Sequence, residues 1–345
     1  MQRATRLIVL ALLFAAVALP FAAPTYYMQF ATKVLILGVL AMGLNLVVGF
    51  GGLISLCHAA FYGIAGYILA IAAPKYQPAS LWLTLPLALI ASSAAALVLG
   101  ALSLRTRGVY FIMVTLAFGE MLFYLFHDTQ FAGGSDGAFI NLKPEAMLFG
   151  VNVLDLDNAR VFYWTVLALA VLTILLLHAI TRAPFGRALA AARDNERRAR
   201  SLGFPIYRVR LTAFVISGAL AGLAGYFAAA QFGFVAPEML GWHQSAIALV
   251  MVVLGGQRGV AGPLIGAIIV MGLEEELKGL TEHWKLIEGL IIIAIVLTFP
   301  SGLQGLIARA FPAHDPEKAG PGPDPGWKPV FGQDHAQIKR EGGNG

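Results

Sequence analysis

Long apolar runs, separated by short charged or turn-forming stretches, occupy most of the first 300 positions of the chain. A helix needs roughly 20 such residues to cross a bilayer. The runs predict ten candidate spans, of which the eighth and ninth are short and interrupted by glycine. Their ranges are 7–23, 30–49, 58–73, 81–104, 109–127, 161–180, 211–230, 244–255, 260–273 and 286–299.

One long polar segment, 181–210, divides the apolar runs into six before it and four after it. It carries eight arginines against only Asp194 and Glu196. Residues 187–202 are rich in Ala, Arg and Leu and predict one amphipathic helix, which Gly203 and Pro205 should end. A dense Arg cluster beside spanning segments stays in the cytoplasm, so this segment is expected there.

The distribution of Lys and Arg supports an orientation. With the N-terminus inside, 18 of the 24 basic residues fall on the cytoplasmic side and 6 outside, Lys33 among the latter. This satisfies the positive-inside rule. Ten spans with both termini cytoplasmic are therefore the predicted topology.

Composition agrees with a polytopic α-helical membrane protein. The 345 residues are 58% hydrophobic and 12% charged, about half the charged fraction of a soluble domain. The net charge of +5 does not indicate nucleic acid, because the basic residues cluster in loops at one membrane face. Cys57 is the only cysteine, which excludes an intrachain disulfide and argues against a Cys-based metal site.

The two ends of the chain differ from its middle. Residues 1–24 have the charge and small residues of a signal peptide, but the apolar stretch is long, so we expect an uncleaved first helix. The Pro- and Gly-rich tail, 311–345, is expected to be disordered. We therefore predict a membrane domain over 1–310 and a cytoplasmic tail.

Polar residues and glycines interrupt the apolar sequence at 49–58, next to Asn45. Gly51 and Gly52 are followed by Ser55 and His58. A broken backbone at membrane depth is tolerated only when it is buried in protein or lines a cavity, and broken helices mark binding regions in many transporters. A plain tight turn is the equally weighted alternative.

Ionisable residues inside a span are candidate functional sites. Glu120 lies within 109–127, five residues after Thr115, and either a substrate role or a structural hydrogen bond fits it. The run 274–276, three glutamates, is expected to be solvated at the outer end of the ninth span.

Small residues recur at helix-face spacing in the seventh and ninth spans. Gly218, Gly222 and Gly225 share one face of the seventh, and Gly262 and Gly266 one face of the ninth. Such residues let helix backbones approach closely in lipid, and close packing is favoured here over gating hinges.

Motifs for bond-making chemistry are missing from the sequence. There is no phosphate-binding loop, no His-Glu-x-x-His pair, no nucleophile elbow and no paired carboxylates. We expect no catalysis, no metal and no cofactor bound by this chain.

Seven stretches together resemble the permease subunits of branched-chain amino acid ABC importers, the LivH/LivM family, and specifically its LivM type. They are GLNLVVGFGGLISLCHAAFYGIAGY (43–67), RTRGVYFIMVTLAFGEM (105–121), GGSDG (133–137), FGRALAAARDNERRARSLGF (185–204), PEMLGWHQS (237–245), MVVLGGQRGVAGPLIGA (251–267) and FPSGLQGL (299–306).

The resemblance implies an importer permease fold in the bacterial inner membrane. It implies a second, LivH-like permease, two cytoplasmic ATPases that use ATP, and a periplasmic binding protein that delivers the ligand. The coupling loop of the family falls on Phe185, Gly186, Arg187, Ala188, Leu189, Ala192, Ala199 and Gly203. The substrate path is expected near Asn45, Gly51, Gly52, Ser55, His58, Phe61, Tyr62, Thr115 and Glu120.

Other functions stay open at this point. Within the family the ligand is a branched-chain or other neutral amino acid, urea or a short amide. An ion-coupled secondary transporter working alone is the alternative from another class, and it is expected to carry charged pairs deep in several spans. A membrane enzyme is a further alternative, but it lacks a recognisable catalytic set.

Overall fold

The computed structural model describes residues 20–21, 24–74, 77–130, 133–148, 151–152, 154–257 and 259–298. Nearly all of the first expected span, 7–23, and the whole tail, 311–345, lie outside the described residues. The expectations for these two segments therefore stay predictions.

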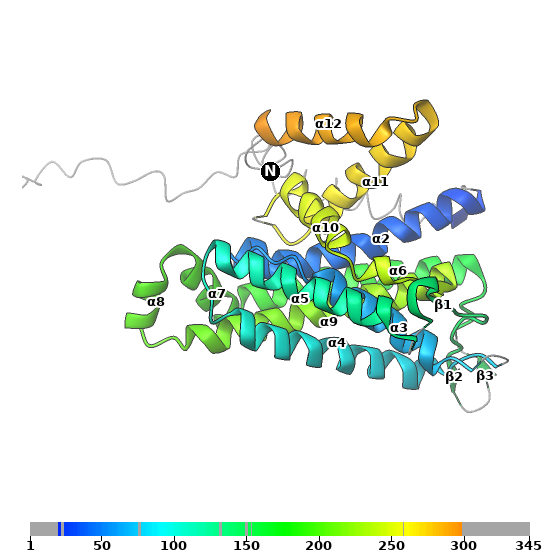
Figure 1. Cartoon of the computed structure of the whole chain (residues 1–345), viewed down its shortest axis with the longest axis horizontal. Helices are drawn as coiled ribbons and strands as arrows, with labels where there is room; N and C mark the ends of the chain where they lie inside the picture. The colour runs from blue at the N-terminus through cyan, green and yellow to red at the C-terminus, as the bar shows by residue number, and fades with distance from the viewer. Residues whose placement is uncertain are drawn as a thin grey trace, which may run out of the picture.

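Helices form most of the described chain (Figure 1). Several of them lie roughly along the long axis of the molecule (Figure 1). The main helices follow in chain order. They are α2 (Thr25–Asn45), which continues as the π-helix η1 (Leu46–Phe50), α3 (His58–Ala72), α4 (Leu81–Ser103), α5 (Val109–Asp128), α6 (Ala159–Arg182), α9 (Ile206–Phe232), α10 (Trp242–Gly255), α11 (Gly262–Leu280) and α12 (Trp284–Thr298).

Five helical segments in the described chain are long and apolar enough to cross a membrane: Thr25–Phe50, α4, α5, α6 and α9. The helices α3 and α10 are apolar but shorter. Each of the nine expected spans that fall in the described residues coincides with a helix. The count of ten spans and the cytoplasmic placement of the termini stay predictions.

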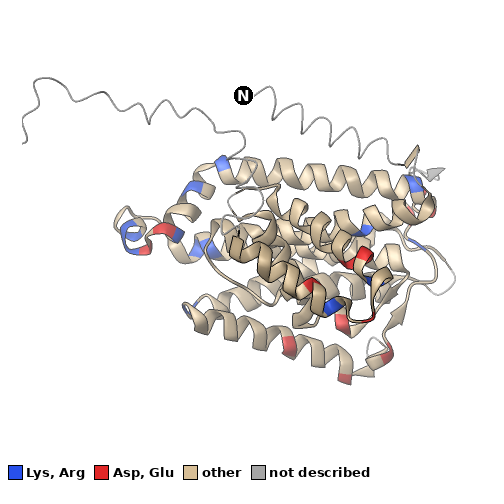
Figure 2. Ribbon diagram, turned by 90° about the horizontal axis from the view of Figure 1, so that it is seen from above, with Lys and Arg blue, Asp and Glu red and all other residues tan. Residues whose placement is uncertain are grey.

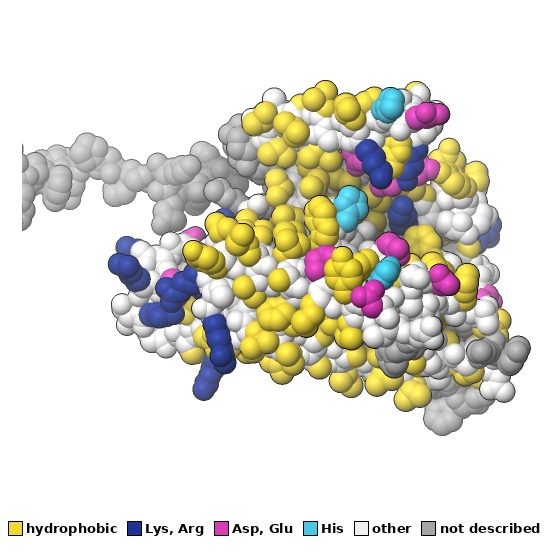
Figure 3. Space-filling view, viewed as in Figure 1, with side chains coloured by type: hydrophobic (Ala, Val, Ile, Leu, Met, Phe, Trp, Pro, Cys, Tyr) yellow, Lys and Arg dark blue, Asp and Glu magenta, His cyan; other side chains and the backbone are white. Residues whose placement is uncertain are grey.

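The core is built around α2 and α9, which are the most buried of the long helices. Helix α9 packs against α2, α3 and α4, and α2 also packs against α6, α10 and α11. A helix that is hydrophobic on all sides belongs inside a bundle. By contrast, α4 and α5 expose large apolar side chains, and hydrophobic atoms cover much of the visible flank of the molecule (Figure 3).

Glycines allow the central helices to touch. A Cβ atom on Gly225 of α9 would lie 1.8 Å from the Tyr62 carbonyl oxygen of α3, and one on Gly222 would lie 2.2 Å from Ser92 Oγ of α4. A Cβ on Gly266 of α11 would lie 1.9 Å from the Met251 carbonyl oxygen of α10. These contacts confirm the expected close packing by small residues.

The long loop between α5 and α6 lies at one end of the bundle. It contains the 3-10 helix η3 (Gly134–Asp136) and the two-residue strands β1 (Ala138–Phe139), β2 (Met147–Leu148) and β3 (Val151–Asn152). Strand β1 pairs antiparallel with β4 (Phe234–Val235), which follows α9, and β2 pairs with β3. The 3-10 helix η4 (Pro237–Met239) then leads to α10.

The polar segment at the opposite end forms two helices, α7 (Pro184–Asp194) and α8 (Glu196–Ser201) (Figure 1). The prediction of one helix over 187–202 is therefore wrong. Asn195 has an extended backbone, and its side chain accepts a hydrogen bond from Arg198 N at 3.0 Å, which caps α8. Lys and Arg gather at this end (Figure 2).

Candidate functional site

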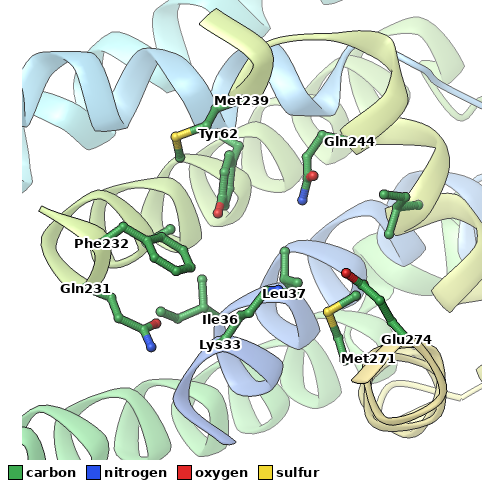
Figure 4. A pocket seen from close by; sticks show the side chains of 12 residues that line it. Lys33, Ile36, Leu37, Tyr62, Gln231, Phe232, Met239, Gln244, Met271 and Glu274 are labelled. Carbon is green, nitrogen blue, oxygen red and sulfur yellow. The ribbon is translucent and has the colours of Figure 1, made fainter. Parts of the chain in front are cut away.

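A cavity of about 220 Å³ lies between α2, α3, α9, η4, α10 and α11 (Figure 4). Its polar lining residues are Lys33, Tyr62, Gln231, Gln244 and Glu274. The rest of its wall is apolar and consists of Ile36, Leu37, Ala228, Phe232, Met239, Ile247 and Met271. The cavity thus combines charged groups of both signs with a hydrophobic surface.

The two charged residues come from different helices. Lys33 lies in α2 and is half-buried, and no other described residue forms a hydrogen bond or ion pair with its ammonium. Glu274 lies in α11 with its side chain 17% exposed, and one of its oxygens pairs with Lys278, one turn further along. Lys33 therefore presents an uncompensated cation to the cavity.

Three neutral polar side chains also border the cavity. Gln231 Nε2 donates a hydrogen bond to the Gln29 carbonyl oxygen at 2.8 Å. Its Oε1 is buried and finds no partner in the described part of the chain. The Tyr62 hydroxyl and the Gln244 amide both point into the gap between the helices (Figure 4).

A second cavity of about 230 Å³ adjoins the first. It shares Lys33, Gln231 and Phe232 with the first, and its remaining lining residues are Tyr26, Gln29, Phe30 and Glu275. Because Tyr26, Gln29 and Glu275 are polar, this chamber is the more hydrophilic of the two. It lies nearer the start of α2, and the Tyr26 hydroxyl donates to the Glu275 carboxylate across it.

Among the nine residues expected along the substrate path, only Tyr62 lines the main cavity. Phe61, Ser55, His58 and Thr115 are fully buried. His58 bridges two serines, with Nε2 at 2.8 Å from Ser217 Oγ and Nδ1 at 3.1 Å from Ser55 Oγ. The structure therefore brings most of the predicted polar residues together, but inside the protein.

Hydrogen bonds from this buried group join several helices. Ser217 Oγ of α9 donates to the Gly43 carbonyl oxygen of α2 at 2.6 Å, and Ser245 Oγ of α10 accepts from Ala59 N of α3 at 2.8 Å. Asn45 Nδ2 donates to the Gly259 carbonyl oxygen at 3.0 Å. These hydrogen bonds link α2, α3, α9 and α10, although Asn45 Oδ1 is buried and has no partner in the described residues.

The backbone between η1 and α3 is irregular and packs against protein rather than lining the cavity. Gly52 has a φ of +68°, which favours glycine. Arg193 of α7 donates a hydrogen bond to the Gly49 carbonyl oxygen, and Leu189 of α7 lies next to Gly51. The predicted break is present, and its contact is with the polar segment.

Glu120 lies away from the cavity, half-buried in α5. Its Oε1 accepts a hydrogen bond from Trp242 N at 3.2 Å, at the start of α10. Of the two roles that the sequence allowed for Glu120, a substrate contact and a structural hydrogen bond, the structure shows the hydrogen bond.

The residues expected to couple to an ATPase fall into two groups. Gly186, Ala188, Leu189, Ala192 and Ala199 are buried against this chain itself. Ala192 and Ala199 pack with Ile206 of α9. Arg187 and Gly203 are exposed and Phe185 is half-buried. The small-residue stripe therefore holds α7 and α8 on the bundle.

Glu196 anchors the polar segment electrostatically. Its carboxylate lies 3.2 Å from Arg107 of the α4–α5 loop, 2.6 Å from Arg200 of α8 and 3.0 Å from Arg210 of α9. Burial alone would raise the pKa of this carboxyl, but the three arginines outweigh burial and lower the pKa below its ordinary value. The segment is thus tied to two other parts of the bundle.

Sequence reasoning missed Lys33, Gln231, Gln244 and Glu274 as site residues. The expectation that Glu274 is solvated beyond the ninth span is wrong, because α11 continues to Leu280 and places Glu274 at the cavity. A signal was present, since Lys33 is a charged residue within a long apolar helix. Within the described residues no group of His, Cys, Asp or Glu is arranged to hold a metal ion.

Taken together, the long apolar helices and an interior cavity with polar and charged lining define a multi-pass membrane protein of the permease class. Residues 26–296 match the model of the family described as branched-chain amino acid transport system / permease component, and the chain belongs to that family.

Two curated relatives are high-affinity branched-chain amino acid transport system permease proteins LivM. The one from Salmonella typhimurium (strain LT2) is 35% identical over 317 residues, which covers 86% of this chain and 74% of the relative. The one from Escherichia coli (strain K12) is 35% identical over 319 residues with the same coverage.

The corresponding LivH permease of Salmonella typhimurium is 26% identical over 281 residues, covering 77% of this chain and 90% of the relative. No solved structure matches the chain.

Proposed function

We propose that this chain is a permease subunit of an ATP-binding cassette importer that carries branched-chain or related neutral amino acids across the bacterial inner membrane. The observation that carries the proposal is the match of residues 26–296 to the family of branched-chain amino acid permease components. The 35% identity to LivM proteins, over most of both chains, supports the same assignment.

The chemistry of the main cavity favours an amino acid over other ligands of the class. A branched-chain amino acid carries a carboxylate, an ammonium group and an apolar side chain. The cavity offers Lys33, Glu274 and a hydrophobic wall. Urea and short amides, the alternative ligands, carry no charge and would leave Lys33 without an opposite charge at a partly desolvated position, whereas Glu274 is already paired with Lys278.

The energy for transport is expected to come from partners. We propose a second, LivH-like permease beside this chain, two cytoplasmic LivG/LivF-like ATPases below the pair, and a periplasmic amino-acid-binding protein. ATP is hydrolysed by the ATPases, and this chain is not itself an enzyme. The sequence similarity to both LivM and LivH proteins supports a paired permease.

The segment α7–α8 is the proposed docking surface for an ATPase. Its small residues are buried, so the contact falls on the outward face, where Arg187, Leu202, Gly203 and Phe204 are exposed. Leu202 is 69% exposed at the tip, and an exposed apolar side chain among arginines is suited to a protein contact. ATP-driven closure of the ATPases would move this segment and switch the permeases between a state open to the outside and a state open to the cytoplasm.

An ion-coupled transporter working alone is the alternative from another class. In the described helices, Glu120 accepts a hydrogen bond from the backbone at the start of α10. Lys33 and Glu274, which line the main cavity, lie near one end of the bundle. Charged pairs deep in several spans, which such a mechanism needs, are not found among the described residues.

The test is reconstitution of this chain with the LivH-like permease, the ATPases and the binding protein in proteoliposomes. Leucine uptake should require ATP inside the vesicles and binding protein outside. Uptake that persists without ATP and follows an ion gradient would overturn the proposal in favour of a secondary transporter. ATP-dependent uptake of urea without leucine uptake would overturn the assigned ligand class.

A further inference from the structure

We propose that Lys33 and Glu274 form a binding site for a zwitterionic amino acid on this chain. Lys33 binds the α-carboxylate, and Glu274 binds the α-ammonium group. The assignment rests on the proposed transport function for the identity of the ligand. The residues named here recognise the carboxylate and the ammonium group of that ligand.

Lys33 and Glu274 each carry a charge that can bind a ligand. The ammonium of Lys33 is half-buried beside an apolar wall without an anionic partner in the described chain. Glu274 has one oxygen paired with Lys278 and the second oxygen free to bond. A zwitterion bound between α2 and α11 gives each of these groups a charge-assisted hydrogen bond.

The two charged residues also border one and the same cavity. Lys33 of α2 and Glu274 of α11 line it together with the neutral polar residues Tyr62, Gln231 and Gln244. A small ligand in this cavity can therefore contact both charged residues.

The apolar half of the cavity suits the side chain of the ligand. Ile36, Leu37, Met239 and Met271 line it, and methionine adapts to side chains of different shape. A cavity of about 220 Å³ has room for one small amino acid. Leucine, isoleucine and valine are therefore accommodated by one surface.

The second cavity provides a route of entry. It is lined by Tyr26, Gln29 and Glu275 and meets the main cavity at Lys33, Gln231 and Phe232. A hydrated amino acid enters the polar chamber first and loses water as it passes the ring of Phe232. Both chambers lie on the side where the charge distribution places Lys33 outside the cell, which is the side from which an importer takes its ligand.

The experiment uses thiol labelling, because Cys57 is the only native cysteine and is fully buried. Gln244→Cys is introduced into the full importer in right-side-out membrane vesicles without binding protein. A membrane-impermeant maleimide should label it, and leucine should protect it. 4-Methylpentanoate, which lacks the ammonium group, and 3-methylbutylamine, which lacks the carboxylate, should protect poorly.

Lys33→Met and Glu274→Gln are then added separately to Gln244→Cys. Each should raise the leucine concentration for half-protection about ten-fold or more, because each removes a charge-assisted hydrogen bond. Lys285→Met and Glu276→Gln are matched controls, since they remove the same charges from residues that line neither cavity, and they should leave protection unchanged.

Three results would overturn the inference. In the first, Gln244→Cys does not react with the maleimide in the absence of leucine. In the second, leucine and 4-methylpentanoate protect Gln244→Cys from labelling equally well. In the third, Lys33→Met and Glu274→Gln leave the protection by leucine unchanged. None of these would affect the proposed function, which depends on ATP-driven leucine uptake by the unmodified importer. Equal labelling of all variants without leucine establishes that they are folded.

Discussion

Two polar regions border α2, and they differ in how their hydrogen-bonding groups are used. Near its C-terminal end, Ser217 bonds to the Gly43 carbonyl oxygen and to His58, with almost no exposed surface. Near its N-terminal end, Lys33 lines an open cavity without a hydrogen-bond or ion-pair partner in the described chain. Polar groups that are paired within the protein hold helices together, whereas unpaired ones beside a cavity are available to a ligand.

The largest expected effect concerns the close packing of α9 against α3. Gly225→Leu places a side chain where even a Cβ would lie 1.8 Å from the Tyr62 carbonyl oxygen. It should destabilise the protein by about 3 kcal/mol or more, since neighbouring backbones cannot yield. The measurement is the yield and thermal unfolding of the detergent-solubilised chain. Gly272→Leu in α11 is the control, because nothing lies within 4 Å of its Cβ position, and an equal loss there would refute the packing argument.

A smaller effect is expected at the centre of the buried network. His58→Leu removes hydrogen bonds to Ser55 and Ser217 and should cost about 2 kcal/mol of stability. In the fraction that folds, the KM for leucine should stay within two-fold of wild type. His243→Leu, at an exposed position of α10, is the matched control. A ten-fold change in KM for His58→Leu would place this residue on the substrate path and remove the distinction drawn above.

The smallest effect is expected at Glu196, where charges are paired but partly exposed. Glu196→Gln should lower stability at pH 7 by about 1 kcal/mol. Because the folded state lowers the pKa of Glu196, its stabilising effect is full above the unfolded-state pKa and is lost as the pH falls through the folded-state value. Thermal unfolding of the two proteins should therefore converge at low pH. A difference that is independent of pH would show that the ion pairs contribute nothing.

The positions of the helices could be predicted well from the sequence, but the contacts between helices could not. An apolar run indicates where a helix lies, because apolar side chains are stable only inside the protein or in lipid. Helix α3, for example, begins at His58, as expected. Ends were less certain, since α2 begins at Thr25 and α11 continues through three glutamates. An apolar helix tolerates such residues when the charged ends of their side chains reach solvent or a cavity.

The candidate site depended on contacts between helices far apart in the sequence. Lys33 and Glu274 lie on α2 and α11, and no local pattern relates them. The concentration of Ser55, His58 and Asn45 was visible locally, yet the sequence does not say whether such polar groups bond to one another or face a cavity. Asn195 illustrates the same limit, because its N-cap role divides a segment whose composition predicts one helix.

The contact between α7 and η1 gives the long helix a mechanical property. Arg193 holds the Gly49 carbonyl oxygen at one end of the continuous helical segment, and Lys33 lies sixteen residues away, roughly 24 Å along the axis. Hydrogen bonds along a helix resist changes in its length, so we expect a push on α7 to shift the whole segment, Lys33 included. Helix α2 with η1 thus connects the polar segment at one end with the main cavity near the other.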